Sequence, residues 1–181
     1  QRTKELSSRD ELTGLFNRRY FFENLETEAQ RARRYRRAFT ILMLDLDHFK
    51  HYNDTHGHLF GDRALRQGGE ILLANTRRAD VVARFGGEEF VILLPEIDKE
   101  AGARVAEKIR IKIAEHPFHG RERQPGGQLT VTIGVATYPV DSDNGLELVD
   151  MADRALYVGK RQGGNRVVLS SGQDRPAPQL V

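Results

Sequence analysis

A seven-residue segment between two apolar runs constrains the fold of this chain more than any other feature. Residues 84–90 read RFGGEEF, with the apolar residues 81–83 before them and 91–95 after them. Two adjacent glycines between such runs predict a tight β-hairpin, because glycine adopts the positive φ angles that these turns require. Two carboxylates, Glu88 and Glu89, follow the glycines. Acids at a glycine-rich tip suit a metal ion and a phosphate, although a solvated turn fits this segment equally well.

A second pair of acids closes the apolar run of residues 39–46, which predicts a buried central strand. Strand side chains alternate between faces, so Asp45 and Asp47 share one face and the leucines between them take the other. A buried carboxylate is costly unless a cation or hydrogen bonds satisfy it, and Mg²⁺ binds one or two carboxylates together with substrate phosphates. The two acid clusters therefore indicate a metal and phosphate site if the hairpin lies beside this strand. Alternatively, Asp47 caps a short helix starting at His48.

Hydrophobic periodicity predicts the remaining elements. Helices are expected over residues 18–37, 63–76, 99–115 and 146–160, and strands over 39–46, 81–83, 91–95, 129–137 and 166–169. The order of these elements favours a single α+β domain with a mixed sheet and helices packed over it. Residues 116–127 predict a loop, and residues 170–181 a disordered C-terminal tail.

Length and composition exclude several protein classes. The 181 residues suffice for one domain with a proper core, and 39% hydrophobic with 30% charged residues is ordinary for a soluble protein. The absence of cysteine excludes disulfides and thiolate metal sites and makes a reducing cytoplasm the expected location. No run approaches the roughly 18 apolar residues that span a bilayer. The polar start without methionine indicates a piece of a longer protein, whose upstream part could be membrane-anchored.

Several motifs resemble those of GGDEF-domain diguanylate cyclases, with the hairpin segment as the signature in its GGEEF form. Similar motifs occupy residues 10–19, 45–50, 53–62, 134–136 and 152–157, and the resemblance extends over about residues 6–168. Several motifs in order are far more specific than one. The resemblance implies a ferredoxin-like, nucleotidyl-cyclase palm fold with a central, mostly antiparallel sheet. It also implies a catalytic domain over residues 10–169, with residues 1–9 ending an upstream signalling helix.

The resemblance implies that two GTP molecules are condensed into cyclic di-GMP with release of two pyrophosphates. It assigns Asp45, Glu88 and the Leu46 carbonyl to a Mg²⁺ or Mn²⁺ ion, and Asp45, Glu88 and Glu89 to catalysis. A metal ion would stabilise the attacking and leaving oxygens, and positioning supplies much of the rest. Glu88 is either a general base or only a metal ligand. Each domain would hold one GTP, so the resemblance implies a homodimer.

The resemblance also places a substrate site. Asn53 and Asp62 match the positions that read guanine, whose N1–H and N2–H₂ donors suit a carboxylate, whereas adenine lacks this pair. Lys50 and Lys160 resemble phosphate contacts, and Phe49 is assigned to the same site. Local alternatives exist: Asn53 in a turn, Asp62 as the N-cap of a helix from residue 63, and Lys160 as a solvated residue at a helix end.

One position departs from the family pattern. Gly164 stands where the family commonly has an arginine that grips the phosphates. Arg161 or Arg166 could replace it, or GTP binding could be weaker.

Residues 77–80 read RRAD and match the inhibitory RxxD pattern of the family. The resemblance therefore implies that Arg77 and Asp80 bind cyclic di-GMP as a non-competitive inhibitor, with the arginine offering a planar fork to phosphate or guanine.

Two other functions compete with an active cyclase. The first is a catalytically weak cyclic di-GMP receptor that keeps the RxxD site, for which Gly164 is the only support. The second is a nucleic-acid binder using the basic residues 31–37, but the net charge of +2 favours a solvated helix face. The same run could instead contribute a second product contact across a dimer. The six histidines show no recognised zinc spacing and are interpreted as structural or exposed.

Overall fold

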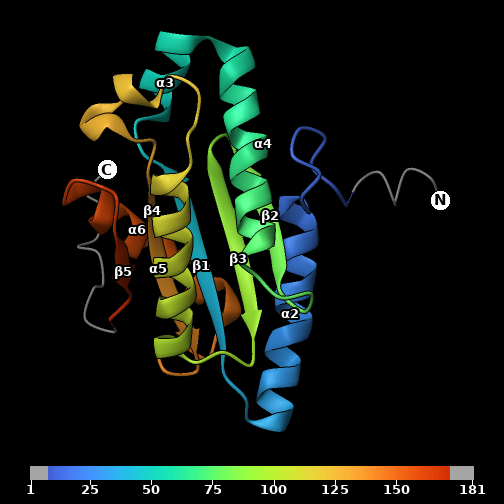
Figure 1. Ribbon diagram of the computed structural model, residues 1–181. Helices are drawn as coiled ribbons and strands as arrows, with labels where there is room; N and C mark the ends of the chain where they lie inside the picture. The colour runs from blue at the N-terminus through green and yellow to red at the C-terminus, as the bar shows by residue number, and fades with distance from the viewer. Residues whose placement is uncertain (1–7, 172–181) are drawn as a thin grey trace, which may run out of the picture.

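Five strands form a single mixed β-sheet in the computed structural model, which describes residues 8–171 (Figure 1). The strands are β1 Phe39–Leu46, β2 Val81–Gly86, β3 Glu89–Pro95, β4 Val131–Tyr138 and β5 Val167–Leu169, in the spatial order β2-β3-β1-β4-β5. All neighbouring pairs are antiparallel except β4 and β5, which are parallel. The predicted α+β fold with a mixed, mostly antiparallel sheet is confirmed.

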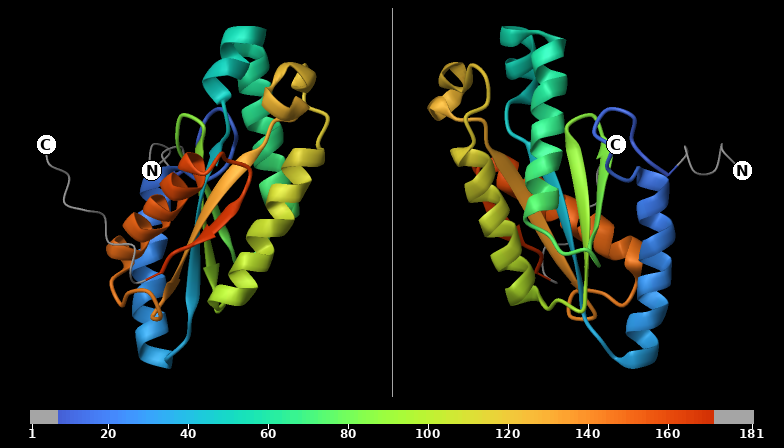
Figure 2. Two further views of the ribbon diagram at one scale, coloured as in Figure 1. Left: turned by 90° about the vertical axis from the view of Figure 1, so that its left-hand side faces the viewer. Right: turned by 45° about the vertical axis from the view of Figure 1, so that its right-hand side comes forward.

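Helices cover both faces of this sheet (Figure 2). Helices α2 (Arg18–Tyr35) and α6 (Gly145–Arg161) pack on one face, and α4 (His58–Ala74) and α5 (Lys99–Glu115) on the other. Helix α3 (Phe49–His56) connects β1 to α4. The second predicted helix therefore starts earlier than residue 63, because Gly57, at φ +88°, ends α3 and immediately begins α4. The loop after α5 contains two short 3₁₀ turns, η1 (Arg121–Arg123) and η2 (Pro125–Gly127).

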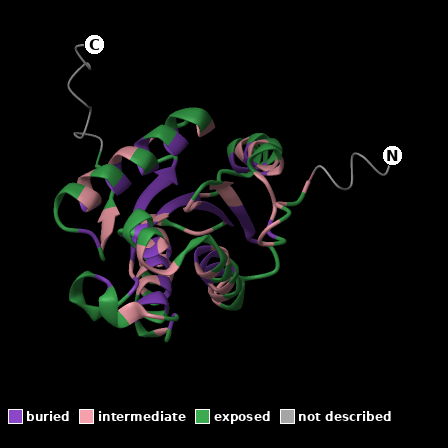
Figure 3. Cartoon of the chain, turned by 90° about the horizontal axis from the view of Figure 1, so that it is seen from above, coloured by how far each residue is buried: buried purple, intermediate pink, exposed green. Residues whose placement is uncertain are grey.

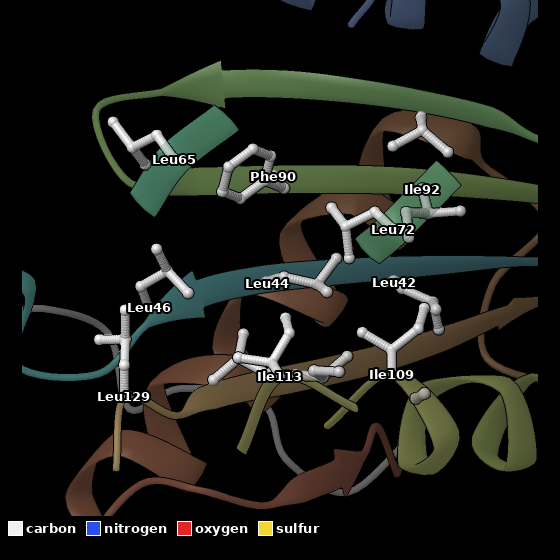
Figure 4. Packing of buried hydrophobic residues seen from close by; sticks show 14 of the residues in the cluster. Leu42, Leu44, Leu46, Leu65, Leu72, Phe90, Ile92, Ile109, Ile113 and Leu129 are labelled. Atoms are coloured by element: carbon white, nitrogen blue, oxygen red, sulfur yellow. The ribbon is translucent and has the colours of Figure 1, made fainter. Parts of the chain in front are cut away.

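Strand β1 is buried on both faces, which explains its nearly continuous apolar sequence. Leu42, Leu44 and Leu46 point into the core formed with α4 and α5 (Figure 4). Phe39 and Met43 face the second core, under α2 and α6. Seen from above, the buried strands lie between helices whose outer sides are exposed (Figure 3). Each fully buried apolar side chain contributes about 1.5–3 kcal/mol of hydrophobic stabilisation.

Strand pairing brings the two acid clusters together. In the β1–β3 register Asp45 lies opposite Glu89. Gly87 and Glu88 form the two-residue turn between β2 and β3, and Gly87 adopts φ +50°. The predicted tight hairpin is thus confirmed, and it lies beside the central strand as the metal-site interpretation requires.

The two ends of the described chain are attached to the domain. Arg9 forms an isolated antiparallel bridge with Phe16. Ser170, at the start of the predicted tail, is buried; its N–H donates to Val135 O, and its carbonyl accepts from Lys99 Nζ. Of the upstream helix expected over residues 1–9 and the tail expected over residues 170–181, residues 1–7 and 172–181 lie outside the described part of the chain, and Ser8 and Arg9 form a turn and a bridge. Within residues 8–171, no helix combines the length and apolarity needed to cross a membrane.

The core on the α4 and α5 side generates a stability prediction. Leu44→Ala removes a fully buried side chain from the centre of the sheet, so we expect a loss of about 2–5 kcal/mol in the free energy of unfolding. Leu73→Ala, at a side chain that is 54% exposed, should change it by no more than about 0.5 kcal/mol. Urea denaturation measures both, and equal losses would contradict the assigned core.

Candidate active site

Lys160 connects two carboxylates at the C-terminal end of β1. From the last turn of α6, its Nζ lies 2.8 Å from Asp45 Oδ1 and 2.8 Å from Asp47 Oδ1. It also donates to the Asp45 carbonyl at 3.2 Å. The alternative of a solvated lysine at a helix end is wrong, since this ammonium group pairs with acids at and just after the end of the central strand.

Asp47 is the most heavily hydrogen-bonded carboxylate of this region. It accepts from Thr130 Oγ1 at 2.7 Å, Thr132 Oγ1 at 2.6 Å and the Asn165 N–H at 2.8 Å. Burial acts to raise the pKa of Asp47, but the hydrogen bonds from Lys160 and the threonines, with the lysine charge, outweigh it and the pKa is lowered. The helix-cap alternative is wrong, because Asp47 binds β4 and the loop after α6 instead. Asp47 therefore fixes the position of Lys160.

The acids around the turn carry negative charge that the protein only partly compensates. Burial, together with the charges of Glu88 and Asp47, raises the pKa of Asp45 despite the Lys160 hydrogen bond. Burial and then the charges of Asp45, Asp153 and Glu88 likewise raise the pKa of Glu89. Sequence reasoning had noted Asp153 only as part of a helix motif. A cation bound here would relieve this repulsion.

The donor set at this edge fits a hard cation such as Mg²⁺. The Leu46 N–H donates to the Glu88 carbonyl at 3.3 Å, which keeps the turn against the end of β1. Asp45, Glu88 and the Leu46 carbonyl offer only oxygen ligands. Across residues 8–171, no three histidine or acidic side chains are arranged to bind a metal by themselves. Two carboxylates that leave the remaining positions to phosphate and water match the way Mg²⁺ usually binds.

The signature turn is anchored by residues at the start of the domain. Arg84 Nε and Nη2 donate to the Gly87 carbonyl at 2.9 and 2.8 Å, and Arg84 Nη1 lies 3.3 Å from Asp10 Oδ1. Asp10 in turn accepts from Thr13 N and Oγ1. Burial alone would raise the pKa of Asp10, but the Thr13 hydrogen bonds and the Arg84 charge lower it. Sequence reasoning identified residues 10–19 as a motif but not this contact with the turn.

Helices α3 and α4 carry the predicted base-reading residues. Asn53 lies within α3, so the turn alternative is wrong, and Asp62 lies inside α4, which excludes its N-cap alternative. Lys50 is exposed near the start of α3. The Phe49 side chain is only 5% exposed and belongs to the core, so a substrate could meet this residue only through its backbone.

Two histidines attach α3 to the loop after α5. His51 Nε2 lies 3.1 Å from the Arg123 carbonyl, and His56 Nε2 lies 3.1 Å from the Gly120 carbonyl. These contacts support the structural interpretation for both residues.

Gly164 has a structural role of its own. Its φ is +74°, and a Cβ at this position would lie 2.9 Å from both Cγ and Oδ1 of Asp47. Arg166 donates to the Gly164 carbonyl at 3.0 Å, and the Arg161 guanidinium lies 5.8 Å from the Tyr157 ring centre. A side chain at position 164 would therefore crowd the buried carboxylate in this loop conformation.

Arg77 and Asp80 lie at the start of β2, at the opposite end of that strand from Glu88. The Asp80 side chain is 2% exposed and pairs with Arg77 Nη2 at 2.6 Å, while the Arg77 N–H donates to it at 2.6 Å. Arg77 Nη2 also donates to the Pro95 carbonyl. Half of the Arg77 side chain stays exposed and lines a pocket of about 340 Å³ shared with Glu28 and Arg31.

Comparison with known proteins finds one family over nearly the whole chain. The family model described as diguanylate cyclase, GGDEF domain, matches residues 7–166. Diguanylate cyclase DgcP of Pseudomonas aeruginosa is 42% identical over 168 residues, which cover 92% of this chain and 24% of that protein. Response regulator PleD of Caulobacter vibrioides is 39% identical over 167 residues, which cover 91% of this chain and 36% of that protein. The chain thus spans only about a quarter to a third of the length of these curated relatives.

A solved structure shows the same fold. The coiled coil and GGDEF domain of DgcB from Caulobacter crescentus, in complex with c-di-GMP, gives a TM-score of 0.83 at 31% identity, covering 93% of this chain and 88% of that one.

The contact between Asp10 and Arg84 generates a prediction on pH dependence. Because the folded pKa of Asp10 lies below its unfolded value, its stabilisation is present above about pH 4 and is lost as the pH falls through the folded pKa. We expect the free energy of unfolding, measured with urea, to decrease less steeply below about pH 4 in Asp10→Asn than in the wild type. Glu11→Gln, at an exposed neighbouring carboxylate, is the matched control. An identical decrease in the free energy of unfolding below about pH 4 in the wild type and Asp10→Asn would refute the assigned interaction.

Proposed function

We propose that this chain, which belongs to the GGDEF-domain family of diguanylate cyclases, condenses two GTP molecules into cyclic di-GMP with release of two pyrophosphates. The observation that carries the proposal is the β1–β3 register, in which Asp45 lies opposite Glu89 and the Glu88 turn lies beside the strand end. This pairing assembles acidic side chains from segments more than forty positions apart in the sequence. The family match over residues 7–166 supports the same reaction.

The acids would hold a divalent cation, Mg²⁺ or Mn²⁺, through Asp45, Glu88 and the Leu46 carbonyl. When bound, it would stabilise negative charge on the phosphate oxygens as a ribose 3′-hydroxyl attacks the α-phosphorus. Lys160 partly compensates Asp45 before nucleotide binds and is close enough to the same edge to meet the phosphates. Glu88 serves as a metal ligand and is the candidate base for the hydroxyl proton. Glu89, the first residue of β3, completes the acidic edge.

The nucleotide would lie between this edge and helices α3 and α4. Asn53 and Asp62 would read guanine, and the Asp62 carboxylate suits the N1–H and N2–H₂ donors. Lys50 and the backbone at Phe49 would meet the phosphates from the start of α3.

Each domain offers one such site, so joining two GTP molecules requires two copies facing each other as a homodimer. An upstream sensor domain in a longer, cytoplasmic or membrane-anchored parent protein would control this encounter through residues 1–9. The length of the relatives, of which the chain spans about a third or less, supports additional domains.

Product would bind at Arg77 and Asp80 and inhibit the enzyme. The buried Asp80 holds the Arg77 guanidinium by a paired hydrogen bond and leaves half of the side chain facing solvent. A planar, exposed guanidinium of fixed orientation suits phosphate or the guanine edge. DgcB, a structural relative, was solved with c-di-GMP.

A cyclic di-GMP receptor with weak catalysis is the second candidate function. One observation favours it: Gly164 offers no charge to the phosphates, and Arg166 is engaged with the loop backbone instead.

Product formation tests the proposed reaction. We expect the purified chain with GTP and Mg²⁺ to form cyclic di-GMP, and a version dimerised by a fused coiled coil to form it faster. Glu88→Gln should lower the rate at least about 100-fold, because it removes a metal ligand. Glu122→Gln, at an exposed acid in η1, is the control. Chromatography measures the product, and no product from either wild-type form would favour the receptor.

Calorimetry with cyclic di-GMP tests the RxxD site. We expect Arg77→Ala to weaken binding by at least about tenfold, because it removes a charge-assisted contact. It should also lower the melting temperature, since Asp80 would remain buried without its cation. Arg78→Ala, at the exposed neighbouring arginine, should change neither quantity. Unchanged affinity in Arg77→Ala would remove this site from the proposal.

A further inference from the structure

Gly61 lies in a helix, but its backbone conformation does not require a glycine. It is buried in α4, four residues after the glycine that separates α3 from α4, and it is absent from the glycines with positive φ. Any residue can adopt helical backbone angles, and glycine is among the poorest helix formers. The reason for glycine at this position must therefore lie in the space that a side chain would occupy.

That space is filled by Asn53. A Cβ built on Gly61 would lie 1.7 Å from Asn53 Oδ1 and 2.9 Å from Asn53 Cγ, both closer than a Cβ approaches a non-bonded atom. The backbone prevents the two helices from separating to make room. The Gly57 N–H donates to the Asn53 carbonyl at 2.7 Å, and the Gly61 N–H donates to the Gly57 carbonyl at 3.1 Å. The carboxamide of Asn53 therefore keeps its place only while residue 61 lacks a side chain.

The position of the Asn53 carboxamide against Gly61 costs folding free energy. Its Oδ1 is buried and has no hydrogen-bond partner among the residues that the structure describes. An unsatisfied buried acceptor disfavours folding, so packing alone does not account for an asparagine here. Asp62, the other residue with a base-reading role, directly follows Gly61 in α4.

We infer that Gly61 is a positioning residue for base recognition: its missing Cβ holds the Asn53 carboxamide in the orientation that lets Asn53 and Asp62 favour guanine over adenine. The base-reading part of this inference rests on the proposed function. The packing of Asn53 against Gly61 does not, and the two parts have separate tests.

The packing is tested by thermal unfolding of the full chain. Gly68→Ala is the matched control, because Gly68 is a buried glycine in the same helix and its Cβ would meet nothing within 4 Å. We expect Gly68→Ala to raise the melting temperature by about 1–4 °C through better helix propensity. Gly61→Ala should lower it by at least about 2 °C through overpacking.

A double substitution decides whether Asn53 causes the loss. Asn53→Ala removes the atoms that lie closest to the added Cβ. In that background Gly61→Ala should raise the melting temperature as Gly68→Ala does. An equal loss with and without the Asn53 side chain would overturn the positioning role.

The base preference is tested by calorimetric titration of GTP and ATP as their 3′-deoxy analogues with Mg²⁺, which lack the attacking hydroxyl and therefore bind without reacting. We expect Gly61→Ala to lower the ratio of GTP to ATP affinity by about tenfold or more, the usual effect of one base contact, with ATP affinity unchanged. General destabilisation would not change this ratio. An unchanged ratio overturns the base-reading role. A wild-type chain without preference for GTP overturns that role together with the proposed function, while the double substitution still decides the packing.

Discussion

Burial of β1 on both faces is the constraint on which the rest of the structure depends. Its apolar residues contribute to both cores, and its pairing with β3 and β4 shields both of its edges. A shift of the β1–β3 register by one residue would exchange the side chains that face the two cores and would separate Asp45 from Glu89. The hydrophobic core therefore also determines where the acidic side chains meet.

Charge balance at the end of β1 follows from that placement. Hydrogen bonds and Lys160 lower the pKa of Asp47, whereas Asp45 and Glu89 remain a strained pair because burial and then the neighbouring carboxylates raise the pKa of each. The two kinds of acid have different consequences. Asp47 organises the lysine and the loop after α6, and the strained pair creates an edge that favours a cation.

Local sequence patterns predicted much of the fold and of the site. The bounds of β1 and the two-residue turn at Gly87 follow from hydrophobic periodicity and glycine chemistry, both of which act over a few neighbouring residues. The start of α4 was missed, because Gly57 allows two helices to meet without a polar linker. The alternatives for Asp47 and Asp62 as helix caps failed for the same reason: a cap depends on where a helix begins, which is decided by packing.

By itself, the sequence determined most of the long elements, the family and the residue types of the candidate site, because these depend on local periodicity and on motifs in a recognisable order. Only the tertiary structure decided which side chains meet. The contact of Arg84 with Asp10 joins residues 74 positions apart, and that of Asp47 with Lys160 joins residues 113 positions apart. Gly61 shows the same limit at short range. Its purpose becomes visible only when two helices place the Asn53 side chain where a Cβ would be, because excluded volume is a property of packed neighbours and not of the residue alone.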